Sequence, residues 1–127
     1  MTTTPQSAKR GDVVLVLFPN SNLRTAKTRP ALVVQADNLD TGLPQIIVAM
    51  ITSKMFRAGH PSRVSVLLSS PQGQQSGLLT DSVIMTDNLA TIAVSAVDRI
   101  IGSLPMAEID TAISRTLGLS PTTAPVA

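Results

Sequence analysis

The sequence has no cysteine, tryptophan or tyrosine, and phenylalanine occurs only twice, at Phe18 and Phe56. Without cysteine, neither a disulfide-stapled domain nor a thiolate metal site can form. Charged residues are also scarce, at 14%, whereas hydrophobic residues make up 43%. That balance is the reverse of the composition that keeps a chain disordered, so it indicates a folded protein with a real core.

Long apolar runs are missing as well. The densest one, QIIVAMITS (45–53), is far too short to span a bilayer, and the polar start MTTTPQSAKRGD has no signal-peptide core. We therefore expect a cytoplasmic protein with no membrane contact. The length of 127 residues suits a single domain. We place this domain at 10–119, between a flexible N-terminal tail (1–9) and a disordered C-terminal tail (120–127).

The charge is unevenly distributed along the chain. From Lys9 to Arg63 there are eight cations and three acids, a net charge of +5. From Val64 onward there are two cations and five acids, a net charge of −3. A basic half favours an anionic partner such as a phosphate backbone, although a surface that merely segregates its charges has the same composition.

Short β-branched runs separated by polar loops predict a mainly β fold. The run DVVLVLF is continuous, which is typical of a strand buried on both faces, whereas RVSVLL alternates. Two loops, 19–28 and 53–62, are long and basic, and 69–77 reads as a flexible connection. One helical turn is expected at 95–98. The expected strands are 12–18, 30–35, 45–52, 63–68, 81–87 and 99–104.

Only the C-terminal part predicts a regular helix. Four apolar residues recur there at helical spacing, after a proline at the expected first position and before a glycine that can end the helix. These are Met106, Ile109, Ile113 and Leu117, with Pro105 and Gly118 at the ends. Strands, polar loops and one terminal helix together predict a small, strongly curved β-barrel with a C-terminal α-helix.

Few residues suit catalysis. His60 is the only histidine, and it is either a surface residue of a basic loop or a catalyst. One histidine and scattered carboxylates do not have metal-ligand spacing, so we expect no metal. Arg29 precedes Pro30 at the start of one expected strand, and Thr52 ends the next. If these strands are adjacent and antiparallel, the pair converges and can clamp a phosphate, although Thr52 also suits an ordinary strand end.

Five segments, in this order, resemble the MazF/PemK family of toxins from type II toxin–antitoxin systems, over Arg10–Leu119. They are RGDVVLVLF, TRPALVVQADN, IIVAMITSK, DSVIMTDNLATI and RIIGSLPMAEIDTAISRTLGL. The resemblance implies an SH3-like barrel with a C-terminal helix, usually a homodimer, whose toxicity is held in check by a cognate acidic antitoxin.

The resemblance also implies an enzyme: a metal-independent, sequence-specific endoribonuclease, with no cofactor, that cleaves single-stranded mRNA and so inhibits translation and growth. The 2′-hydroxyl attacks the adjacent phosphorus and leaves 2′,3′-cyclic phosphate and 5′-hydroxyl ends. Arg29 and Thr52 match the family's catalytic positions, and Asp87 matches an aspartate proposed as a base in some members. The expected RNA-binding residues are Arg24, Lys27, Ser53, Lys54, Phe56, Arg57 and His60.

Phe56 is either a stacking platform for a base or a hydrophobic anchor of its loop; with so few aromatics, hydrogen-bond readout of bases is favoured. The chain departs from the family pattern in the loop 22–28 and at Met85, Asn88 and Ala90. Two alternatives share the same barrel. One is a non-catalytic module that binds RNA or a protein partner. The other is a CcdB-like gyrase poison, which the absence of tryptophan disfavours.

Overall fold

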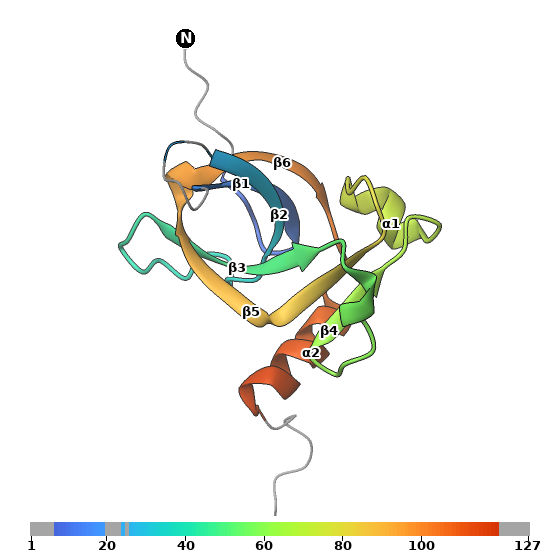
Figure 1. Ribbon diagram of the computed structural model, residues 1–127. Coiled ribbons are helices and arrows are strands. Elements are labelled where there is room, and N and C mark those ends of the chain that lie inside the picture. The colour runs from blue at the N-terminus through green and yellow to red at the C-terminus, as the bar shows by residue number, and fades with distance from the viewer. Residues whose placement is uncertain (1–6, 20–23, 25, 120–127) are drawn as a thin grey trace, which may run out of the picture.

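The computed structural model describes residues 7–19, 24 and 26–119. Most of the two predicted tails, and part of the loop between the first two strands, therefore lie outside the described residues. The elements, labelled in Figure 1, are β1 (Asp12–Pro19), β2 (Ala26–Val33), β3 (Gln45–Thr52), η1 (Met55–Arg57), β4 (Arg63–Val66), α1 (Pro71–Ser76), β5 (Ser82–Ala93), η2 (Val94–Ala96), β6 (Val97–Ser103) and α2 (Ala107–Leu117).

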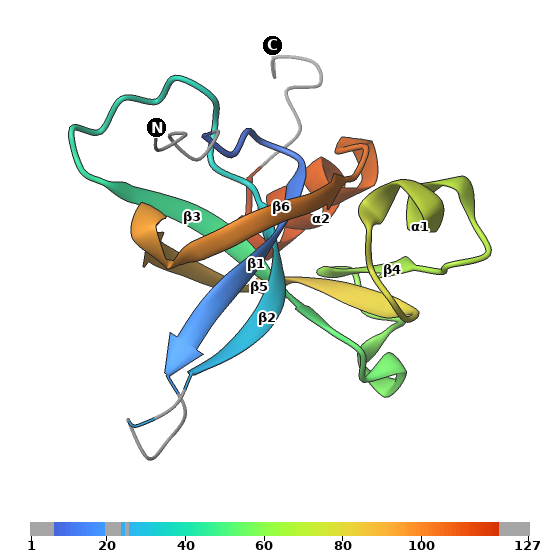
Figure 2. The same ribbon diagram turned by 90° about the horizontal axis from the view of Figure 1, so that it is seen from above.

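The strands form one antiparallel sheet in the order β4-β5-β3-β2-β1-β6. Figures 1 and 2 show this sheet curling on itself, with β1, β2 and β6 lying over β3 and β5. The predicted mainly β fold with a curved, barrel-like sheet and a C-terminal helix is confirmed. Among the described residues, no helix has the length and hydrophobicity needed to cross a membrane.

The curled sheet buries a hydrophobic cluster on each face. Val13 belongs to the cluster that also contacts α2 through Ile109, whereas Val14 and Val16 belong to the other. Because successive side chains of a strand point to opposite faces, the continuous apolar run of β1 serves both clusters. The expectation that this strand is buried on both faces is confirmed for Val13, Val14 and Val16, whereas Leu17 is 42% exposed.

Several element boundaries differ from the prediction. The segment expected to be a flexible connection contains α1. There Ser70 caps the helix by accepting a hydrogen bond from the Gly73 N–H (3.0 Å), and Gly77 ends it with φ +74°. Strand β2 starts at Ala26 rather than at Pro30. Strand β5 runs on to Ala93: its first residues pair with β4 on one side and β3 on the other, and its last residues, from Leu89, pair with β3.

The predicted terminal helix is present as α2, with two changes. It is capped by Met106, so Pro105 precedes the helix rather than opening it. Ile109 is fully buried, but Leu117, which we expected on the apolar stripe, is exposed. Gly118 ends the helix with φ +70°, as its position predicted.

Candidate functional site

Arg29 and Thr52 lie at the same level of two neighbouring strands. Strands β2 and β3 are antiparallel, and Ala31 faces Met50, the last pair of the ladder at this end. Continued for two residues, the same register sets Arg29 opposite Thr52. The predicted adjacency of these strands is therefore confirmed. Pro30 has no N–H to donate, which explains why the ladder to β3 stops beside it and the strands part there.

A cavity of about 550 Å³ opens where β2 and β3 part, and both Arg29 and Thr52 line it. Its described lining contains no acidic residue but four cations and five hydroxyl groups. The cations are Lys27, Arg29, Lys54 and Arg99, and the hydroxyls belong to Thr28, Thr52, Ser53, Thr80 and Ser82. Across the described residues, no three His, Cys, Asp or Glu side chains group together as metal ligands. The cavity is chemically suited to a phosphate group.

The hydroxyl of Thr52 is held in place by a turn that follows the strand. The backbone N–H of Lys54 donates a hydrogen bond to Thr52 Oγ1 (3.1 Å). This short local ring fixes the oxygen relative to the backbone. Because a hydroxyl has one proton besides its acceptor lone pairs, Thr52 remains able to donate to a ligand in the cavity.

Arg99 was missed by the sequence reasoning. It lies on β6 opposite Leu15 of β1, and Leu15 in turn faces Pro30 of β2. Arg99 is 70 residues from Arg29 in the sequence, and the pairing of the last strand with the first brings it to the same cavity. Pairing each strand with the next one in the sequence would set β6 beside β5. In the sheet β6 lies beside β1 instead, so that rule would not place Arg99 at the cavity.

A family model for the PemK-like, MazF-like toxin of type II toxin–antitoxin systems matches residues 9–119. The chain belongs to this toxin family. The match extends over almost all of the described residues, so the cavity and all its lining residues fall within it.

Solved structures of such toxins share the fold of this one. The toxin MazF-mt6 of Mycobacterium tuberculosis is 25% identical, covers 86% of this chain and 98% of its own, and has a TM-score of 0.66. A mycobacterial endoribonuclease solved with its cognate antitoxin is 22% identical, with coverages of 89% and 97% and a TM-score of 0.66. A MazE–MazF structure from Deinococcus radiodurans is 19% identical, with coverages of 90% and 99% and a TM-score of 0.68.

The toxin's other predicted RNA-binding residues fall into two groups. Lys27, Ser53 and Lys54 line the cavity together with Arg29 and Thr52. The remaining four are not part of its lining: Arg24, Phe56, Arg57 and His60. Roles for either group stay predictions.

The four predicted RNA-binding residues outside the cavity are exposed or contact their own neighbours. Arg24 is exposed. The Phe56 ring is 80% exposed, and the Arg57 guanidinium lies over it at 5.8 Å. Arg57 also donates to Met85 Sδ (3.5 Å), and His60 Nδ1 forms a hydrogen bond with Ser62 Oγ (2.7 Å).

Asp87 is held by a neighbouring arginine and does not line the cavity. Arg63 donates from Nη2 to Oδ2 (2.8 Å) and from Nε to Oδ1 (3.4 Å). The hydrogen bond from Arg63 lowers the pKa of the Asp87 carboxyl below its ordinary value. A carboxylate with a lowered pKa is a weaker base, so these contacts favour a structural role over the predicted catalytic one.

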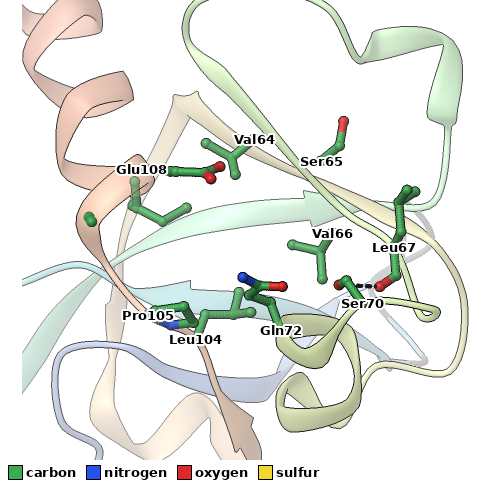
Figure 3. Close-up of a pocket in the computed structure, with 11 residues that line it drawn as sticks. Val64, Ser65, Val66, Leu67, Ser70, Gln72, Leu104, Pro105 and Glu108 are labelled. Carbon is green, nitrogen blue, oxygen red and sulfur yellow. Dashed lines mark hydrogen bonds between the residues drawn. The ribbon is translucent and has the colours of Figure 1, made fainter.

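A second cavity, of about 370 Å³, lies between β4 and the start of α2 (Figure 3). Val64, Val66 and Leu104 give it an apolar lining, and Glu108 is its one charged side chain among the described residues. A site without a cation, and with a carboxylate, repels phosphate. The cationic cavity beside β2 is therefore the candidate functional site.

Proposed function

We propose that this toxin is a metal-independent, sequence-specific endoribonuclease that cleaves single-stranded RNA, chiefly mRNA, and thereby inhibits translation and growth. One observation carries the proposal: Arg29 and Thr52 both line a cationic cavity whose described lining has no acid, at the end of the ladder between their strands. Membership of the MazF-like toxin family supports it, as does the description of a structural relative as an endoribonuclease.

The proposed reaction takes its nucleophile from the substrate. The 2′-hydroxyl loses a proton and attacks the adjacent phosphorus, the bond to the 5′-oxygen breaks, and that oxygen takes up a proton. The products are a 2′,3′-cyclic phosphate and a 5′-hydroxyl. The protein has only to align the attack and stabilise the charge on the pentavalent phosphorus. The Arg29 guanidinium supplies positive charge, and the fixed Thr52 hydroxyl donates to a phosphate oxygen.

The proposed partner that restrains this activity is an acidic antitoxin. Two of the solved relatives are complexes, one with a cognate antitoxin and one of MazE with MazF. The four cations of the described cavity lining favour binding of an acidic segment over the same cavity that would bind RNA. We also propose that the toxin acts as a homodimer in the cytoplasm, where its mRNA substrate is found.

Cleavage in the presence of EDTA tests the proposed function. Purified toxin is incubated with single-stranded RNA, and the product ends are mapped. We expect specific cuts that end in cyclic phosphate, with Arg29→Ala lowering the rate by about 10²–10³-fold, as loss of an oxyanion-stabilising donor does. Lys9→Ala removes an exposed cation that does not line the cavity, and it should leave the rate unchanged.

Intact RNA at saturating wild-type protein would contradict the proposal and favour a barrel that binds RNA without cutting it. Cleavage that EDTA abolishes would contradict the metal-independent chemistry. Urea unfolding of Arg29→Ala at matched conditions separates loss of chemistry from loss of fold.

A further inference from the structure

We propose that Arg99, with Leu79 and Thr80, forms a second subsite of the cavity that binds the phosphate and base of a nucleotide flanking the scissile phosphate. This inference rests on the proposed function, since it assigns more of the same RNA substrate to the cavity. The family motifs that identify Arg29 and Thr52 do not include these three residues. The structure alone brings them to the site.

Arg99 and Arg29 reach the cavity from different places. Arg99 faces Leu15, and Leu15 faces Pro30, so β1 stands between the two arginine-bearing strands. Two strand spacings separate the backbones by about 10 Å. Paired residues share a face of a sheet and successive residues alternate, so the side chains of Arg99 and Arg29 leave their strands on opposite faces. Both residues nevertheless line the cavity, because it opens at the end of the β2–β3 ladder. Two guanidinium groups arranged in this way suit two phosphates rather than one.

The charge of Arg99 is not neutralised within the described part of the chain. Its side chain forms no hydrogen bond or ion pair with another described residue. Asp98, its neighbour in sequence, is the unpaired residue of a β-bulge against β1 and forms no ion pair with it. Arg99 is exposed, and the described cavity lining has no acid, so its guanidinium is available to an anionic ligand. A phosphate matches the fork of an arginine in both shape and charge.

Two leucines form an apolar wall of the cavity that Arg99 also lines. Leu79 is 94% exposed, and it lines the cavity together with Leu78, which packs on the core. The flat face of a base needs an apolar contact. The chain has no tyrosine or tryptophan, and Phe56 does not line the cavity. Leu79 is therefore suited to contact a base without selecting it, while the Thr80 hydroxyl can hydrogen-bond its edge or the backbone.

Helix α1 fixes the position of this wall. Gly77, at its end, has no room for a side chain, because a Cβ would lie 2.0 Å from the carbonyl oxygen of Ile101 on β6. Gln75 Nε2 donates to Ser103 Oγ at 2.9 Å, which gives a second tie to the same strand. The segment leading to Leu79 thus begins from a rigid contact with the strand that bears Arg99. Arg99 lies on β6, and the segment that carries Leu79 is anchored to β6 through α1.

Binding of an RNA that cannot be cut tests the subsite independently of catalysis. A fluorescein-labelled 2′-O-methyl RNA lacks the attacking hydroxyl, and its affinity is measured by anisotropy over a range of salt concentrations. Each phosphate contact adds about 0.7 to the slope of log K against log salt for a single strand. We expect Arg99→Ala to lower the slope by about 0.7 and to weaken binding by about tenfold. Arg99→Lys should keep the slope.

The double variant decides between one phosphate and two. If Arg29 and Arg99 hold separate phosphates, Arg29→Ala with Arg99→Ala lowers the slope by about 1.4; if they share one phosphate, it lowers the slope no further than a single variant. The second result, or an unchanged slope in Arg99→Ala, overturns the subsite. Binding of an acidic peptide but of no RNA overturns it as well. Lys9→Ala is the matched control, with an unchanged slope.

The two proposals fail separately. Wild-type toxin that cuts no RNA but shows the Arg99-dependent slope contradicts the nuclease and supports the subsite. If the toxin cuts RNA, and wild type and Arg99→Ala bind the uncleavable RNA with the same salt slope, the nuclease is supported and the subsite is contradicted.

Discussion

Asp87→Asn distinguishes a structural carboxylate from a catalytic one. The substitution keeps the shape of the side chain and removes its charge, so Arg63 loses its ion pair. It can still donate to the amide oxygen of the new side chain and to the Arg57 carbonyl oxygen (3.2 Å). The side chains of Arg63 and Asp87 are 25% and 31% exposed. A pair this close to water contributes roughly 0.5–1 kcal/mol, and we expect Asp87→Asn to lower the free energy of unfolding by about that amount.

The pH dependence of this loss follows from the lowered pKa. Because the folded state holds the Asp87 carboxyl at a pKa below its unfolded value of about 3.9, the stabilisation is fully present above that value. It is lost as the pH falls through the folded pKa. The difference in stability between wild type and Asp87→Asn should therefore be present at pH 7 and disappear in strong acid.

Urea unfolding and RNA cleavage, measured on the same protein, provide the assay. We expect cleavage by Asp87→Asn to stay within tenfold of wild type, whereas removal of a general base costs about 10²–10⁴-fold. Asp40→Asn makes the same chemical change at an exposed aspartate and is the control for both measurements. A hundredfold loss of cleavage with unchanged stability would refute our reasoning and support the catalytic role matched to Asp87 by resemblance.

Two further predictions concern packing and assembly. Gly102→Ala places a Cβ 2.3 Å from the backbone of Ser76, so we expect it to displace α1 and to lower the free energy of unfolding by about 1–3 kcal/mol in urea. Gly42→Ala adds the same methyl group in open space at φ +77° and should cost only about 1 kcal/mol of backbone strain. Light scattering at micromolar concentration should give the mass of a dimer, and a larger complex with the cognate antitoxin; a monomer would contradict the proposed homodimer.

The strands could be predicted from sequence because apolar periodicity is a local signal. Helix α1 could not, since its six residues are polar or small and show no apolar stripe. Such a short helix is not stable on local propensity and depends on tertiary contacts. Gly73 shows this dependence: a Cβ there would lie 2.0 Å from the Leu67 carbonyl oxygen. Ser70, Pro71 and Gly77 cap this helix, but serine, proline and glycine are equally common in turns, so they do not predict a helix by themselves.

The predicted catalytic residues differed in the same way, although Asp87 lies outside the cavity. Arg29 and Thr52 were found because consecutive strands commonly pair, so their convergence needed only one local assumption. The surroundings of Asp87 depend instead on an irregularity. Met50 faces Met85, but Ala49, the residue before Met50, faces Leu89. The residues around Asp87 therefore bulge out of the β3–β5 ladder. Nothing in the residue pattern predicts a bulge at that point.

Proline and arginine act together at the centre of this site. On one side of β2, pairing with β1 continues through Pro30 to Ala26; on the other, in the part of the chain the structure describes, pairing with β3 covers only Ala31–Val33. A residue with an N–H at position 30 could extend that second ladder and bring the strands together. Pro30 cannot, so the strands part at the residue beside Arg29. The same dipeptide thus ends the ladder where the cavity opens and supplies one of the cavity's cations.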